Sequence, residues 1–232
     1  MRISDCGLPT ADCKPRRHGG TEGKNRGRSA AARLSAMFCL LLPLLGCTAR
    51  VPRNHYYTLR AELSAPPPPA SPLPVSLAVA RFTAASRALG QERLVYRTAP
   101  HRVDFYEYHR WTDAPPDLVA RVLIDRLAAS GLFRSVTAVQ TGVASDFILG
   151  GRVESLEEID SGQDVSARVA ITAELTDATT HAIVWTGRGA KEAPVRDRSV
   201  DGVVQALNDA LADSLDQITR SLLKKWDADQ RR

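Results

Sequence analysis

Cysteine is missing from most of this chain. The four cysteines are Cys6, Cys13, Cys39 and Cys47, and none occurs in the sequence that follows. A disulfide needs two thiols, and the usual structural zinc sites need closely spaced cysteine or histidine ligands. The sequence after Cys47 therefore excludes a disulfide framework and a cysteine-based zinc site. A domain without free thiols suits an oxidising compartment such as the periplasm.

The chain also lacks an apolar run long enough to cross a membrane. Only 16 residues separate Arg33 from Arg50, whereas a spanning helix needs about 20 apolar residues. This short run fits the apolar region of a cleaved signal peptide. It ends in residues 44–47, Leu-Leu-Gly-Cys, which resemble a bacterial lipobox with leucine at −3, a small residue at −1 and cysteine at +1.

The lipobox resemblance implies a specific modification. In such a motif the cysteine thiol takes a diacylglyceryl group, the chain is cut between Gly46 and Cys47, and the new amino group is acylated. We therefore expect a signal peptide over residues 1–46, lipid attached to Cys47 and no other cofactor. A buried apolar segment with a chance cysteine is the alternative. The long, Gly-, Arg- and Ser-rich beginning is also explained by a start codon assigned too far upstream, with synthesis beginning nearer 28–34.

An excess of positive charge is absent once the signal peptide is removed. The whole chain has 31 Lys and Arg against 26 Asp and Glu. Eight of those basic residues and three of the acidic residues precede Cys47, which leaves 23 of each. A protein that binds the phosphate backbone of nucleic acid needs a basic excess or patch. The sequence therefore indicates no nucleic-acid partner.

Catalytic motifs are missing as well. The sequence contains no G-x-S-x-G, H-E-x-x-H, P-loop or G-x-G-x-x-G pattern. A metal site between His101 and His109 is a weaker hypothesis than two solvated loop histidines. We expect Glu157, Glu158 and Asp160 to solvate a turn at the end of a strand. The sequence therefore predicts that the protein is not an enzyme and has no catalytic or metal-binding residues.

The strands expected from apolar and aromatic patterning fall into two groups. The first group is short: residues 55–59, 75–82, 94–97, 103–108 and 133–139, with 94–97 and 103–108 forming a hairpin. The second is an antiparallel meander over 147–157, 165–175 and 183–192, whose middle strand alternates apolar and polar residues. Gly150 and Gly151 in the first meander strand indicate a bulge or a close approach of another group.

Two amphipathic helices are predicted. The first follows Trp111, with Thr112 or Asp113 as its cap, prolines in the first turn and Gly131 closing it at Ser130. The second begins at Ser199 or Asp201. Its apolar stripe, which we expect to pack on the chain's own sheet, comprises Val200, Val203, Val204, Leu207, Leu211, Leu215, Ile218 and Leu222. Together these elements indicate one α/β or α+β domain of about 160 residues.

A proline-rich segment separates the first expected strand from the second. Residues 64–74 hold six prolines, which lack the N–H that a sheet ladder requires and favour an extended polyproline conformation. We expect a stiff spacer that holds the domain off the membrane. A proline-rich ligand for another domain is the alternative.

Four short motifs occur in an order that resembles a known family. They are Cys47, Tyr56-Tyr57-Thr58-Leu59, Leu94-Val95-Tyr96-Arg97, and residues 105–111 (Phe-Tyr-Glu-Tyr-His-Arg-Trp) ahead of the first helix. Over residues 47–225 the chain is similar to the ABC-type transport auxiliary lipoprotein family, which includes the paraquat-inducible-type lipoprotein. The resemblance implies a mixed β-sheet with a C-terminal antiparallel meander, flanked by two main amphipathic helices. It implies a lipidated tether over residues 47–74 and the auxiliary domain over 75–226.

The same resemblance implies a function. It implies a non-catalytic accessory of an ABC transporter and its MCE-type periplasmic subunit, in the traffic of lipids or hydrophobic compounds. Threonine at position 48, rather than aspartate, resembles sorting to the periplasmic face of the outer membrane. Cys47 carries over as the lipid-attachment residue. The family motif positions, with packing roles expected, are Tyr56, Tyr57, Leu59 and Trp111.

Other functions remain open at this point. A periplasmic carrier of lipids or small ligands would need an apolar cavity, which the sequence neither indicates nor excludes. A cell-envelope hydrolase would need a catalytic constellation. A homo-oligomer is a further alternative, and the transported compound is not indicated.

Overall fold

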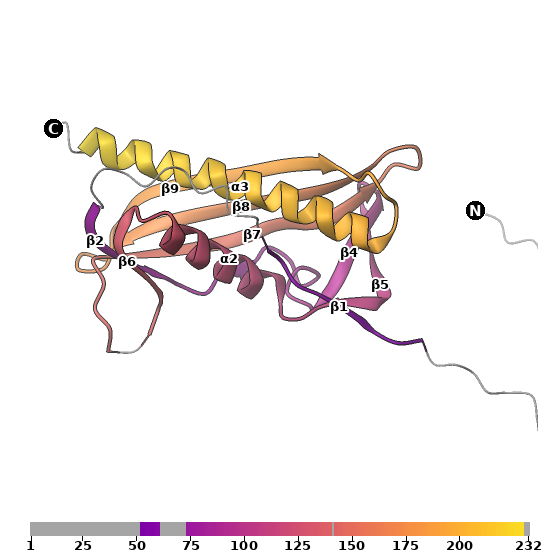
Figure 1. Cartoon of the computed structure of the whole chain (residues 1–232), viewed down its shortest axis with the longest axis horizontal. Coiled ribbons are helices and arrows are strands. Elements are labelled where there is room, and N and C mark those ends of the chain that lie inside the picture. Colours follow the sequence, from indigo (N-terminus) through magenta and orange to yellow (C-terminus); the bar gives the residue numbers. More distant parts are fainter. Residues whose placement is uncertain (1–51, 61–72, 141, 230–232) are drawn as a thin grey trace, which may run out of the picture. The chain divides into compact units, whose positions relative to one another are not determined.

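The sheet is built around one long strand. The computed structural model describes residues 52–60, 73–140 and 142–229. Within them, β7 (Phe147–Asp160), β8 (Val165–Asp177) and β9 (Ile183–Pro194) form an antiparallel meander (Figure 1). The predicted meander is thus confirmed, with longer strands than expected. In β8 every second residue from Val165 to Leu175 is buried, as its alternation predicts.

The other edge of β7 pairs with three short strands in succession. β2 (Leu73–Val79), β3 (Thr83–Ala84) and β4 (Arg93–Ala99) all run parallel to it. Beyond β2 lies β6 (Phe133–Ala138), and beyond β4 lies β5 (Arg102–Trp111), the second strand of the predicted hairpin. These nine strands, counting β1 below, confirm the predicted mixed sheet. The sequence interpretation missed β3, which is only two residues long.

The first strand, β1 (His55–Tyr57), lies at an edge of the sheet and runs parallel to β5. It precedes the proline-rich segment, most of which (61–72) lies outside the described residues. A strand of the sheet therefore comes before the prolines. The interpretation of residues 64–74 as a spacer between membrane and domain is wrong, because this segment connects β1 to β2.

Both predicted helices are present. α2 (Pro115–Ala129) has prolines in its first turn, and Gly131 follows its end at Ser130 with φ of 64°. Its N-cap is Ala114, without a side-chain hydrogen bond, so the expected caps Thr112 and Asp113 are wrong. Pro116 at N2 lacks one of the two N–H groups, those of N2 and N3, from which a capping side chain accepts, and the Asp117 N–H at N3 donates to the Ala114 carbonyl instead.

α3 (Val200–Asp229) covers the meander. The Ser199 hydroxyl accepts a hydrogen bond from the Gly202 N–H at 3.2 Å, which caps the helix where the sequence predicted. The predicted stripe is buried from Val203 to Leu222, and it packs on β8 and β9. Packing on the chain's own sheet is thus confirmed. At the crossing, a Cβ on Gly189 would lie 2.1 Å from the Ser214 carbonyl oxygen.

α2 and α3 lie on the same face of the sheet (Figure 1) and are joined by an ion pair. Arg126 of α2 is nearly fully buried and contacts Asp216 of α3.

On β7 the close approach predicted at the glycine pair occurs at Gly151, where a Cβ would overlap the Phe82 ring. None of the helices within the described part of the chain combines the length and apolar character that crossing a membrane requires.

Candidate functional site

Cys47, expected to carry the lipid, and Gly46, the residue before the expected cleavage, lie outside the described residues, as do the rest of the signal peptide and Thr48. The four family motif positions lie within them. Tyr56 and Tyr57 are in β1, Leu59 follows that strand, and Trp111 ends β5.

Three of these four motif positions face the core or its margin. Trp111 is 1% exposed and Leu59 is also buried, both in the main hydrophobic core. Tyr57 packs against that core, and its carbonyl accepts a hydrogen bond from the Thr112 N–H at 2.8 Å. Tyr56, by contrast, is 62% exposed. Since neighbouring strand residues point to opposite faces, the motif presents one tyrosine inward and one to solvent.

A cluster of aromatic and histidine rings forms side-chain contacts between β1 and β5. The Tyr57 hydroxyl lies 2.9 Å from His109 Nδ1, with which it hydrogen-bonds. The His109 ring stacks on His55 with centroids 5.1 Å apart, and the edge of Tyr106 meets it at 5.6 Å. Burial lowers the pKa of His109, and the neighbouring His55 adds to this. A neutral His109 therefore provides the uncharged ring against which β1 is held.

The same cluster contains a buried carboxyl group. The Tyr106 hydroxyl donates a hydrogen bond to Glu158 Oε2 at 2.6 Å. Burial raises the pKa of Glu158, although this hydrogen bond opposes the increase. Burial and the Glu158 carboxylate also raise the pKa of Tyr106. Tyr106 and Glu158 are thus a tightly coupled pair at the end of β7.

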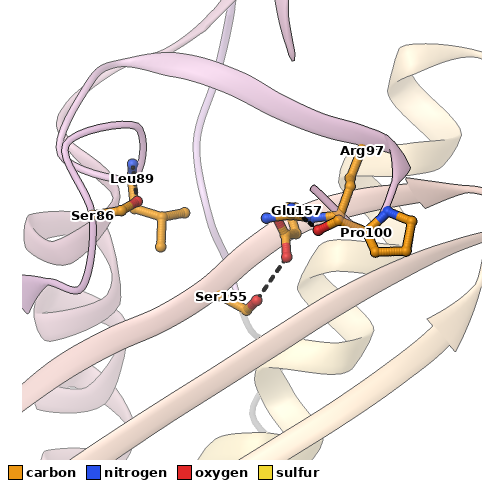
Figure 2. A network of polar contacts seen from close by, with 6 residues as sticks. All are labelled: Ser86, Leu89, Arg97, Pro100, Ser155 and Glu157. Atoms are coloured by element: carbon orange, nitrogen blue, oxygen red, sulfur yellow. Dashed lines mark hydrogen bonds and ion pairs between the residues drawn. The ribbon is translucent and has the colours of Figure 1, made fainter. Parts of the chain in front are cut away.

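Glu157 belongs to a second polar group on the opposite face of β7. Figure 2 shows its carboxylate between the Ser155 hydroxyl, which donates to Oε1 at 2.9 Å, and the Arg97 guanidinium. Arg97 Nη2 lies 3.0 Å from Glu157 Oε2, and its Nη1 donates to the Pro100 carbonyl at 2.8 Å. The ion pair joins β7 to the end of β4.

The structure therefore corrects the expectation for the two glutamates. Glu157 and Glu158 are each only 6% exposed, so they do not solvate a turn. Their partners, Arg97 and Tyr106, lie 60 and 52 residues away in the sequence. No local pattern could have indicated these pairs, because they depend on which strands become neighbours of β7.

An open cavity of about 530 Å³ lies beside the Arg97–Glu157 pair. It is formed by the end of β4, the end of β7 with the turn that follows, and one residue of β8. Its charged lining residues are Arg97, Glu157, Asp160 and Arg168. A cavity with both signs of charge can hold a polar group. Its lining has no cysteine, histidine or lysine, and the groups in it that are capable of acid–base or nucleophilic chemistry include the Glu157 and Asp160 carboxylates and the Ser161 hydroxyl.

The hypothesis of a histidine metal site gains no geometric support. In the described ranges, no three histidine, cysteine or acidic side chains lie close enough together to hold a metal ion. His109 instead contacts Tyr57, Tyr106 and His55.

Comparison with known proteins adds a family match. A model described as the ABC-type transport auxiliary lipoprotein component matches residues 57–219. The fold resembles the crystal structure of protein XCC0632 from Xanthomonas campestris, with a TM-score of 0.66 and 20% identity over 77% of this chain and 100% of that one. A second solved structure, of an uncharacterized protein, gives a TM-score of 0.57 and 15% identity over 74% and 99% of the two chains. No curated protein matches the chain.

Proposed function

The chain belongs to the family of ABC-type transport auxiliary lipoprotein components, and from this premise we propose that it is a lipid-anchored accessory of an ABC transporter. Acyl groups on Cys47 hold it at the periplasmic face of the outer membrane. It does not catalyse a reaction. It acts with an MCE-type periplasmic subunit and an ABC transporter in moving lipids or other hydrophobic compounds across the cell envelope.

The observation that carries this proposal is the extent of the family match. Residues 57–219 run from the last residue of β1 through the first two thirds of α3, so the match spans α2, most of α3 and almost the whole sheet. The lipobox resemblance supports the anchor, because residues 44–47 provide the leucine, glycine and cysteine at the required positions. More than one acyl chain is needed for firm anchoring, at about 0.8 kcal/mol per buried methylene.

The anchor is tested by comparing the wild-type chain with Cys47→Ala in a Gram-negative host. We expect wild type in the outer-membrane fraction with acyl mass on the peptide that begins at Cys47. Cys47→Ala should be mislocalised and carry no such mass. The matched control is Cys39→Ala, which removes a thiol from the apolar run and should leave acylation intact. A soluble, unacylated wild type would contradict the proposal.

The partner is tested by crosslinking the anchored protein in cells and identifying what is captured. We expect an MCE-type subunit or an ABC transporter in the wild-type sample and its loss with Cys47→Ala. The alternative function, a periplasmic carrier of lipids or small ligands, needs an apolar cavity, whereas the open cavity beside Arg97 is lined by four charged side chains. Co-purification of lipid with the domain lacking residues 1–47, in the absence of any captured transporter subunit, would favour the carrier.

A further inference from the structure

The tether that joins the lipid to the folded domain is very short. Because β1 is hydrogen-bonded to β5, the folded part of the chain already begins near Pro52. Only five peptide steps separate Cys47 from Pro52. A fully extended chain covers at most about 3.6 Å per residue, so Pro52 stays within roughly 18 Å of the acylated cysteine. This limit holds for any conformation of the intervening residues.

The surface at that end of the domain is suited to a membrane interface. Residues 52–56 are all exposed, and Tyr56 is 62% exposed. Tyr56 pairs with Arg110 of β5, and the exposed Arg53 and Arg60 flank the strand. Tyrosine is enriched where the headgroups of a bilayer meet water, and arginine is attracted to anionic lipid phosphates. We define residues 52–56 together with Arg110 as the β1 edge.

We propose that the β1 edge lies against the phospholipid bilayer, with the Tyr56 ring among the headgroups. This inference rests on the proposed acylation of Cys47. The opposite end of β7 then points away from the membrane, because β1 pairs with β5, β5 pairs with β4, and β4 pairs with the last residues of β7. Ile183 pairs with Thr176, which pairs with Ile148 near the beginning of β7. At about 3.3 Å per residue, the 14 residues of β7 separate these ends by roughly 45 Å.

The nearby charges are compatible with this contact. On β5, Asp104 is paired with Arg102 at 2.8 Å, so this carboxylate is balanced within the strand. The other acidic residues nearby are the exposed Glu107 of β5 and Asp201 of α3, which interacts electrostatically with Tyr57 and His109. Against these two stand the three arginines Arg53, Arg60 and Arg110. The surface around the β1 edge therefore presents an exposed tyrosine and a net positive charge, which suits contact with an anionic bilayer.

The absence of cysteine after Cys47 makes a direct test possible. Once Cys47 is acylated and residues 1–46 are removed, a single engineered cysteine is the only free thiol. Tyr56→Cys and the matched control Ile183→Cys replace residues that are 62% and 59% exposed. Each full-length variant is expressed, processed, spin-labelled and reconstituted in vesicles of phosphatidylethanolamine and phosphatidylglycerol. The measurement is the label's accessibility to oxygen, which partitions into lipid, relative to a water-soluble nickel complex.

We expect the ratio of oxygen accessibility to nickel-complex accessibility to be several-fold higher for the Tyr56→Cys label than for the Ile183→Cys label. Inserting about twenty Gly and Ser residues after Thr48 adds a mean reach of roughly 25 Å, and should weaken the preference at Tyr56→Cys if the short tether helps to hold it there. Acylated, vesicle-bound protein with the Tyr56→Cys label in water would overturn the inference, as would equal lipid contact at both sites. Protein without acyl mass that stays out of the vesicles would instead contradict the proposed function.

Discussion

At the scale of single residues, two adjacent glutamates of β7 are held in different ways. Glu157 lies opposite Arg168 of β8 in the sheet register, on the polar face of that strand. Its ion pair is with Arg97, which balances its charge. Glu158 pairs across the strand with the fully buried Ala167, and it accepts only the Tyr106 hydroxyl among the hydrogen bonds described here. A buried carboxylate without a cationic partner resists ionisation, which is why burial raises the pKa of Glu158.

Glu158→Gln should therefore change how stability depends on pH. Since the pKa of Glu158 is raised in the folded state, the folded protein binds more protons than the unfolded chain at pH values just above the usual glutamate value. Its free energy of unfolding falls as pH rises through that interval and is not regained at higher pH. Glutamine accepts the Tyr106 hydrogen bond without ionising, so this loss should disappear.

The measurement is the free energy of unfolding in urea from pH 4 to pH 8. Relative to wild type, Glu158→Gln should gain stability as pH rises above the usual glutamate pKa. Tyr106→Phe removes the hydrogen bond that lowers the pKa of Glu158, so its loss of stability should continue to higher pH. Parallel curves for wild type and Glu158→Gln would show that Glu158 ionises normally.

At the scale of elements, the contact between α3 and the meander depends on a glycine. The 30 residues of α3 lie along β8 and β9. At Gly189 the strand meets the helix backbone so closely that a Cβ would lie 2.1 Å from the Ser214 carbonyl oxygen and 3.1 Å from Ile218 Cγ1. Backbone atoms cannot move aside as the end of a flexible side chain can.

Gly189→Ala should destabilise the protein by about 1–3 kcal/mol, the usual cost of overpacking a core. The new methyl group would push the α3 backbone at Ser214 away from β9. The near-UV circular dichroism, to which Trp185 of β9 and Trp226 of α3 contribute, should therefore also change. The matched control is Gly150→Ala in β7, where no atom lies within 4 Å of the new Cβ. That variant should change stability by less than about 1 kcal/mol. Equal losses for both variants would refute the close helix–strand packing at Gly189.

The elements differ in how far the sequence could predict them. The stripe of α3 and the alternation of β8 are local periodic patterns, and both predicted the buried residues. β3 has two residues and no period, so only its pairing with Arg152 and Val153 of β7 defines it. The partners of Glu157 and Glu158 depend on the same long-range pairing. Gly187-Arg188-Gly189 is a lone G-x-G within β9, and its second glycine lies at the contact with α3, which a sequence alone does not show.

At the scale of the whole molecule, the proline-rich segment is an internal connection. Both of its ends are fixed, because β1 pairs with β5 and β2 pairs with β6 and β7. Its length therefore affects the closure of a loop, whereas the length of the sequence between Cys47 and Pro52 would set the distance from the membrane under the proposed acylation of Cys47. The two segments should respond differently to insertion.

Doubling the length of segment 61–72 with Gly and Ser should lower the free energy of unfolding by only about 0.6 kcal/mol, the entropic cost of closing a loop twice as long. An insertion of the same size after Thr48 closes no loop and should leave the free energy of unfolding unchanged. Urea denaturation of both variants measures this. A loss of several kcal/mol from the internal insertion would mean that the original segment makes contacts that the longer one cannot.

The edge position of β1 also determines how the protein responds to tension. With the proposed anchor at Cys47, a pull on the anchor would reach the domain through β1, a strand of three residues that pairs with no strand other than β5 in the described sheet. Beyond this strand the chain continues for residues 58–72 before β2 begins. If β1 were peeled from β5 and the buried Leu59 left the core, the sequence from Pro52 to Leu73 would extend to roughly 70 Å. The strand that we propose to lie at the bilayer is therefore also the strand that a pull on the proposed anchor would detach first.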